Sequence, residues 1–142
     1  MNPNMPIDIP RTLVNQILHH AQEFPEREVC GLIGARNGIP TQCYPVTNVA
    51  EHPECRFLLD AREQINAMRL MRERREDLFA IFHSHPADTA EPSSVDRQQA
   101  DYPDALYLII SLGTKGVLEL RGFRLQGPHQ FEEVPLRLQP AE

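Results

Sequence analysis

The sequence predicts an α/β fold, in which a single domain holds one mixed β-sheet flanked by helices. Three observations predict this class. The chain has 142 residues, enough for one domain that buries roughly two-thirds of the surface of its unfolded form. Segments with apolar residues at helical spacing alternate with short apolar runs. Residues 78–83 and 105–112 are almost entirely apolar, as is typical of strands covered on both faces.

The first third of the chain predicts one helix and two paired strands. Pro10 and Pro25 bracket a segment whose apolar residues recur at helical spacing, which predicts a first helix. Its apolar positions are Leu13, Val14, Ile17, Leu18 and Ala21. Residues 28–34 and residues 41–49 have the composition of strands, and the turn signal Asn37-Gly38 lies between them. These two segments are therefore predicted to pair.

A second helix is predicted to begin after Asp60. Asp60 is expected to cap this helix, with Glu63 as its capping-box partner. The apolar stripe expected to face the core consists of Ala61, Ile65, Met68 and Met71. Residues 69–77 mix acidic and basic side chains, which indicates a solvated helix face rather than a binding patch.

The second half of the chain predicts three strands and a short helix. Residues 78–83 form a strand that ends in a histidine, and a short helix begins at Ser93. Residues 105–112 and 117–125 are the remaining predicted strands, the last because apolar and charged residues alternate in it. We expect residues 1–142 to form one domain, with its core at residues 10–125 and a peripheral tail at residues 126–142.

Composition argues against several functional classes. The net charge of −6 provides no basic surface for a phosphate backbone, which argues against a nucleic-acid partner. No segment approaches the ~20 apolar residues that cross a bilayer, and no secretion signal is recognisable, so we expect a cytoplasmic protein without membrane contact. The three cysteines are odd in number and lack a C-x-x-C pair, which predicts reduced thiols, with Cys30 as a small core residue.

The segment His83-Ser84-His85-Pro86 carries the strongest chemical signal. Side chains two residues apart in a strand project to the same side, so His83 and His85 can direct both imidazoles at one point. Ser84 then faces the other way. Pro86 ends the strand, and residues 87–92 form a loop long enough to return the chain beside the histidines. A third ligand can therefore come from the residues after this loop.

Asp96 is the candidate for that third ligand. Ser93 and Asp96 also have the spacing of a capping box, and on spacing alone the interpretations as a helix cap and as a metal ligand are equally good. The histidine pair favours the ligand. Two histidines and one carboxylate leave the fourth tetrahedral position of zinc open, which is the pattern of a catalytic zinc site.

These residues resemble the signature of the JAMM (MPN-plus, JAB-domain) metallopeptidases. The signature also contains an upstream glutamate, and the run Glu28-Val29-Cys30-Gly31-Leu32-Ile33-Gly34 resembles the strand that bears it. Glu28 is nominated by this resemblance alone, because spacing does not exclude Glu26. The likeness covers residues 10–125 and implies the family fold, which is related to the cytidine deaminase scaffold.

The resemblance also implies an activity. It implies one zinc ion per chain, Zn²⁺, held by His83, His85 and Asp96, with Glu28 as general acid and base and Ser93 as hydrogen-bond donor to the oxyanion. The implied substrate is a peptide or isopeptide bond after the C-terminal Gly-Gly of a ubiquitin-like sulfur-carrier protein. Residues 49–57 and 87–92 are the expected walls of the groove for that tail.

Other classes fit the sequence less well. It contains no His-Glu-x-x-His motif, no Pro-Cys-x-x-Cys motif of a nucleobase deaminase, and no Gly-x-Ser-x-Gly motif of a serine hydrolase. His19, His20, His52 and His129 form no ligand-like group and are read as surface or packing residues. The strongest alternative is a non-catalytic MPN-type interaction scaffold, because some proteins with this fold have no metal ligands.

Overall fold

The structure, a computed structural model, describes residues 5–113 and 119–140. Its elements are β1 (Ile7–Pro10), α1 (Arg11–Glu23), β2 (Cys30–Arg36), β3 (Ile39–Val46), α2 (Ala61–Glu73), β4 (Asp77–His85), α3 (Ser94–Gln99), β5 (Leu106–Ser111), β6 (Glu119–Gly127), β7 (Gln130–Val134) and β8 (Leu136–Gln139). The order of elements predicted between residues 10 and 125 is confirmed. Residues 117 and 118, which begin the last predicted strand, lie outside the described residues.

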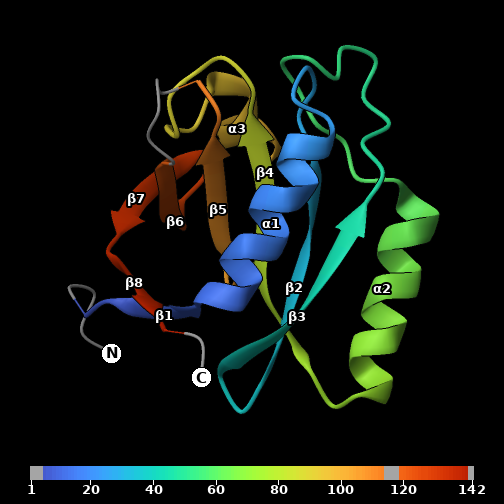
Figure 1. The fold of residues 1–142 in the computed structure, drawn as a ribbon, viewed down its shortest axis with the longest axis vertical. Coiled ribbons are helices and arrows are strands. Elements are labelled where there is room, and N and C mark those ends of the chain that lie inside the picture. The colour runs from blue at the N-terminus through green and yellow to red at the C-terminus, as the bar shows by residue number, and fades with distance from the viewer. Residues whose placement is uncertain (1–4, 114–118, 141–142) are drawn as a thin grey trace.

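Six strands form one mixed sheet in the order β3-β2-β4-β5-β6-β7, which confirms the predicted fold class. β4 lies near the centre, antiparallel to β2 and parallel to β5. The β2–β3 hairpin turns at Asn37 and Gly38, whose φ angles of 53° and 79° are the left-handed values that an Asn-Gly turn supplies. The chain from β4 to β5 crosses over through α3 (Figure 1).

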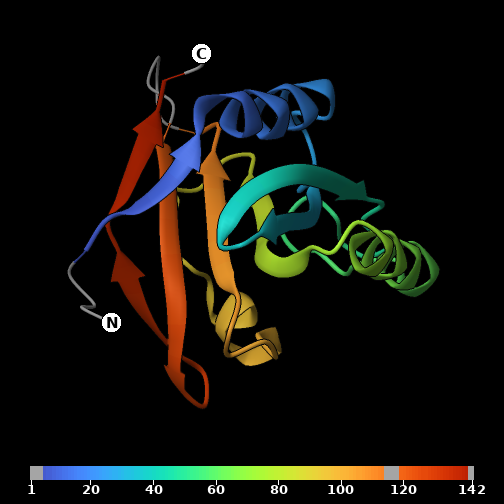
Figure 2. The ribbon, with the colours of Figure 1, turned by 90° about the horizontal axis from the view of Figure 1, so that it is seen from below.

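Helices cover both faces of this sheet. The apolar residues of α1, among them Leu13 and Ile17, pack with Phe82 of β4 on one face. Ala67 and Met71 of α2 pack with Ile81 of β4 on the other face. Figure 1 shows α1 in front of the central strands and α3 behind them, and Figure 2 shows the same arrangement from below. Because side chains alternate along β4, the residues in phase with Ile81 face α2 and α3.

The predicted stripe of α2 is partly wrong. Ile65 is 64% exposed, whereas Ala67 and Met71 are the buried residues of this helix. Asp60 caps the helix as predicted, accepting a hydrogen bond from Glu63 N at 3.0 Å. The Glu63 carboxylate does not complete the capping box. It instead accepts hydrogen bonds from the backbone N and Oγ1 of Thr47, both at 3.0 Å, because the chain after β3 runs beside the start of α2.

The segment expected to be a peripheral tail contains two strands. β7 pairs with β6 at the edge of the large sheet, and β8 pairs in parallel with β1 to form a separate two-stranded sheet. Asp8 and Arg137 form an ion pair across that small sheet, with Arg137 Nε 2.7 Å from Asp8 Oδ1. Among the described residues, no helix combines the length and apolar character that a membrane crossing requires.

Candidate metal centre

His83 and His85 are the last residues of β4 that point toward the α3 side of the sheet. Both are buried, with 2% and 3% exposure. Ser84 points to the opposite side, as predicted, and its Oγ accepts a hydrogen bond from Val29 N at 2.8 Å. Ser84 N donates to Val29 O at 3.0 Å, so Ser84 binds the residue before β2 at two points. The start of β2 is thereby held beside the histidine pair.

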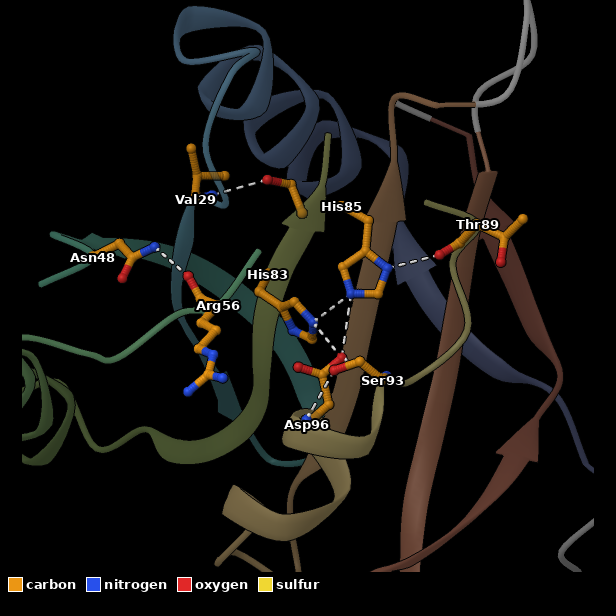
Figure 3. Close-up of polar contacts among 9 residues, drawn as sticks. Val29, Asn48, Arg56, His83, His85, Thr89, Ser93 and Asp96 are labelled. Carbon is orange, nitrogen blue, oxygen red and sulfur yellow. Dashed lines mark hydrogen bonds and ion pairs between the residues drawn. The ribbon is translucent and has the colours of Figure 1, made fainter. Parts of the chain in front are cut away.

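Asp96 lies against both histidines (Figure 3). Its Oδ2 atom is 3.1 Å from His83 Nε2 and 3.2 Å from His85 Nε2, and the two Nε2 atoms are 3.2 Å apart. The same Oδ2 accepts a hydrogen bond from Ser93 N at 2.9 Å, while Ser93 Oγ accepts one from Asp96 N at 3.0 Å. The capping box and the histidine contacts therefore exist together, and cap and candidate ligand are one side chain.

The three atoms fit a tetrahedral metal site. Bonds of about 2.0 Å to a tetrahedral zinc ion place the ligand atoms about 3.3 Å apart, close to the three observed separations. The proton of His85 also has a defined position, because its Nδ1 lies 2.7 Å from Thr89 O and can only donate to this carbonyl. The lone pair of His85 Nε2 then faces the other two atoms, as a metal ligand requires.

Glu28, in the segment just before β2, completes the cluster. One ligand atom from each of Glu28, His83, His85 and Asp96 lies within 4.8 Å of the other three. Cys30 pairs with His83, which brings Glu28 level with His85 at the end of β4. Glu28 is 4% exposed, whereas Glu26 is exposed, so the structure distinguishes two residues that the sequence could not. Glu28 Oε1 is buried and has no hydrogen-bond partner among the described residues.

Burial and mutual contact set the charges of the cluster. Burial raises the pKa of Glu28 to about 8, opposed by the nearby His85 and reinforced by Asp96 and Asp88. Burial also favours the neutral form of Asp96, but hydrogen bonds from both histidines outweigh it and hold the pKa of Asp96 well below its usual range. Burial lowers the pKa of His83. Burial acts in the same direction on His85, where contacts with Asp96 and Thr89 O outweigh it and raise the pKa.

The chemistry available to this cluster follows from its atoms. Two imidazole nitrogens and one carboxylate oxygen converge, while a second carboxylate lies close by with an unpaired oxygen. Such a set can hold a divalent cation and keep a general base beside it. Ser93 lies next to the cluster, and its Oγ uses a lone pair for the helix cap, which leaves the hydroxyl proton for another acceptor.

A pocket of about 480 Å³ adjoins the cluster. Its lining includes Phe57, Leu58 and Leu59 on one side and the residues around the end of α3 on the other. Phe57 connects the pocket to the cluster, because its ring stacks on His83 with the ring centres 4.4 Å apart. Phe57 belongs to the predicted wall at residues 49–57, whereas residues 98, 99, 101 and 102 line the other side of this pocket and none of residues 87–92 lines it. The latter loop instead binds His85 through Thr89.

Two contacts could not have been found from the sequence. Thr89 contacts His85 through its backbone carbonyl, which every residue type has. Asn48 contacts Glu28 O from a loop that has no motif.

The three cysteines are free thiols, and Cys30 and Cys43 are buried. Among the described residues, the cluster at Glu28 is the one group of acidic, histidine or cysteine side chains arranged to hold a metal ion.

Comparisons with known proteins show which family this chain resembles. Residues 10–125 match the family model described as prokaryotic homologs of the JAB domain. The CysO-cysteine peptidase of Mycobacterium tuberculosis is 36% identical over 115 residues, which are 80% of this chain and 78% of that protein. The desampylase of Haloferax volcanii is 34% identical over 103 residues, covering 68% of this chain and 74% of that protein. A probable TtuB-protein conjugate cleaving protease of Thermus thermophilus is 30% identical, and the match covers 77% of this chain and 71% of that protein.

Solved structures show the same fold. The solution structure of DSY2949 from Desulfitobacterium hafniense has a TM-score of 0.80 and 30% identity, and the match covers 96% of this chain and 94% of that one. A JAB1/MPN domain protein from Archaeoglobus fulgidus has a TM-score of 0.58 at 16% identity, with 96% and 99% covered. The second likeness bears on the fold alone.

Proposed function

The chain belongs to the family of prokaryotic homologs of the JAB domain, and from this premise we propose that it is a zinc-dependent peptidase that acts on a ubiquitin-like protein. The bond it hydrolyses is the peptide or isopeptide bond after the C-terminal Gly-Gly of a ubiquitin-like sulfur carrier. The site consists of His83, His85 and Asp96 as metal ligands, Glu28 as general base and Ser93 as oxyanion donor.

The convergence of Glu28 with the three candidate ligands is the observation that carries this proposal. A scaffold needs neither two facing imidazoles nor a buried carboxyl without a hydrogen-bond partner, because burying such groups costs free energy that only a function would justify. The names of the relatives support the substrate class. They are a peptidase for CysO-cysteine, a desampylase and a probable protease for TtuB-protein conjugates.

The residues of the chain divide the reaction among them. A bound zinc ion would lower the pKa of its water toward about 7 and polarise the scissile carbonyl. Glu28, whose Oε1 is free, accepts the proton of the attacking water and passes it to the leaving nitrogen. The Ser93 hydroxyl donates a hydrogen bond to the oxyanion that develops on the carbonyl oxygen. Thr89 O keeps the proton of His85 on Nδ1 and its ring in place.

The pocket beside Phe57 offers a path for the carrier tail. A flexible tail binds best in an extended form against fixed backbone and apolar side chains. Phe57, Leu58 and Leu59 provide such a wall, and the Phe57 ring stacks on His83 at the metal centre. Tyr107 OH accepts hydrogen bonds from Asp101 N and Tyr102 N, which holds the opposite rim. We propose that the tail follows this pocket to the metal centre.

Metal analysis and a cleavage assay together test the proposal. We expect about one zinc ion per wild-type chain and its loss in His83→Ala. The zinc-loaded wild type should release the group attached to the Gly-Gly tail of a sulfur carrier, whereas Glu28→Gln should keep its zinc and lose turnover. A folded wild type that takes up no zinc would sink the proposal. Zinc binding and carrier binding without any cleavage would favour the scaffold.

Two broader points are also part of the proposal. We propose that residues 1–142 act as one domain, because β1 and β8, from the two ends of the chain, pair with each other. We place the protein in the cytoplasm, where the three free thiols would stay reduced.

A further inference from the structure

The segment formed by residues 48–59, here called the wall loop, contacts both the pocket and Glu28. Its last residues line the pocket. Its first residue, Asn48, is half-buried and makes four hydrogen bonds with its side-chain amide. Asn48 Nδ2 donates to Glu28 O and to Arg56 O, both at 2.9 Å, and Asn48 Oδ1 accepts from Ala50 N at 2.9 Å and from Leu58 N at 3.0 Å. Both N–H groups of the Asn48 amide and both lone pairs of its oxygen therefore have hydrogen-bond partners.

The backbone of Glu28 depends on this loop. Glu28 precedes β2, so the sheet gives its N–H and C=O no strand partners. Its N–H donates to Pro53 O at 2.7 Å, and its C=O accepts from Asn48 at 2.9 Å. Both partners belong to the wall loop. The position of the Glu28 carboxyl relative to the metal ligands is therefore set by the loop as much as by the sheet.

The same amide also holds the residues on either side of Phe57. Asn48 Nδ2 donates to the backbone carbonyl of Arg56, and Asn48 Oδ1 accepts from the backbone N–H of Leu58 (Figure 3 shows the contact with Arg56). The backbone of Phe57 is therefore fixed between these two contacts. The Phe57 ring in turn stacks on His83, with the ring planes 21° apart. One side chain thus connects the general base with the pocket wall that touches a metal ligand.

We propose that Asn48 is a positioning residue that couples the substrate pocket to the general base. A tail lying against Phe57 to Leu59 stabilises the wall loop in the arrangement that the Asn48 amide requires. The hydrogen bond from Asn48 then holds Glu28 in position for proton transfer. Occupation of the pocket and readiness of the base are thereby linked through a residue that touches neither the metal ligands nor the reacting bond. This inference rests on the proposed peptidase function.

Asn48→Asp is the sharpest variant. Aspartate has the same shape and keeps the acceptor for Ala50 N and Leu58 N, but it replaces the two N–H donors by an oxygen that repels Glu28 O and Arg56 O. Asn15→Asp is the matched control. Asn15 is exposed on α1, so this substitution makes the same change of charge away from the site. For Asn48→Asp we expect unchanged zinc content, a kcat lower by roughly 10- to 100-fold and a KM that rises several-fold. Asn15→Asp should match the wild type.

Amide hydrogen exchange of the metal-loaded protein supplies a readout independent of turnover. The Glu28 amide donates to Pro53 O and the Leu58 amide donates to Asn48 Oδ1, and both acceptors belong to the wall loop. In Asn48→Asp, exchange should become faster at both amides, because loss of the hydrogen bonds to Glu28 O and Arg56 O loosens this loop. A fall in kcat alone, a rise in KM alone, or unchanged exchange at either amide would overturn the coupling. If the wild type cleaves no carrier, the proposed function fails, and the exchange data alone still decide whether Asn48 links the two segments.

Discussion

Asp96 combines two structural roles in one side chain. Its Oδ2 accepts the hydrogen bond that closes the capping box of α3 and also faces both candidate histidine ligands. The sequence predicted both roles but presented them as alternatives. They are compatible because the start of α3 points at the end of β4, and this is a tertiary relationship that spacing along the chain does not contain.

Replacing Asp96 by asparagine should separate the two roles. The asparagine oxygen can still accept from Ser93 N, so α3 should keep its start, but the ligand loses its negative charge. We expect zinc affinity to fall at least about tenfold, since loss of a partner of a ligand already costs that much. Competition with a chromophoric chelator measures the affinity, and circular dichroism checks the fold. Unchanged affinity would show that Asp96 is only a cap.

Glu28 should make the metal-free protein sensitive to pH. Its pKa is about 8 in the folded protein and 4.5 as its ordinary value. The carboxyl is neutral in both states at low pH, but the unfolded chain ionises first, so folding stability is lost as the pH rises from about 4.5 toward 8. Glutamine cannot ionise. With the metal removed by a chelator, the free energy of unfolding of Glu28→Gln relative to that of the wild type should therefore increase between pH 5 and pH 8, by up to a few kcal/mol.

Urea unfolding of both proteins at the two pH values measures this difference. Asn15→Asp serves as a control for an exposed site. Parallel behaviour of Glu28→Gln and the wild type would mean that the carboxyl is not buried in the metal-free protein.

Some site residues could be predicted and others could not. The His83–His85 pair follows from the two-residue period of a strand, which local geometry determines. The choice between Glu28 and Glu26 required the register of β2 against β4, which depends on contacts between distant parts of the chain. Thr89 acts through a carbonyl that carries no sequence signal.

At the scale of elements, α2 shows where a periodic pattern is ambiguous. Ile65 and Met71 both fit an apolar stripe, yet Ile65 is exposed and Met71 is buried. Glu63, Ala67 and Met71 are spaced four residues apart and share one face of the helix, and this face turns toward the sheet, with the Glu63 carboxylate bound to Thr47. β1 and β8 were not predicted, because four residues are too few for a reliable pattern.

Two alanine substitutions on α2 test this assignment. Met71→Ala removes a 2% exposed side chain from the core and should lower the free energy of unfolding by about 2–5 kcal/mol. Ile65→Ala removes an exposed side chain and should change it by no more than about 0.5 kcal/mol. Denaturant titrations give both values. Similar losses for the two variants would restore the stripe that the sequence predicts.

At the scale of the whole molecule, β1 and β8 join the two ends of the chain. The small sheet also packs on the large one, because Leu136 lies where any side chain at Gly122 would be. The Asp8–Arg137 ion pair is solvent-exposed and should add little, since exposed pairs contribute about 0–1 kcal/mol. Backbone pairing and the packing of Leu136 are therefore the main contributions of β8.

Deletion of residues 135–142 should lower the melting temperature by at least about 4 °C, the shift that roughly 1 kcal/mol produces in a domain of this size. Arg137→Ala should leave it nearly unchanged. Zinc affinity should be unaltered in both, because the metal centre lies at the carboxyl end of β4 and contacts neither terminal strand. Differential scanning calorimetry and metal titration measure the two effects. A deletion that leaves the melting temperature unchanged would show that β8 contributes no stability.

The three candidate ligands lie close together in the sequence, between residues 83 and 96, whereas Glu28 lies much earlier in the chain, just before β2. Closing so short a segment around an ion has a small entropic cost, so we expect this segment to bind metal even in a chain that is only partly folded. Glu28 joins only when β2 pairs with β4. For the proposed metal site, the metal content of a preparation should therefore be an upper bound on its fraction of active molecules, which active-site titration would count directly.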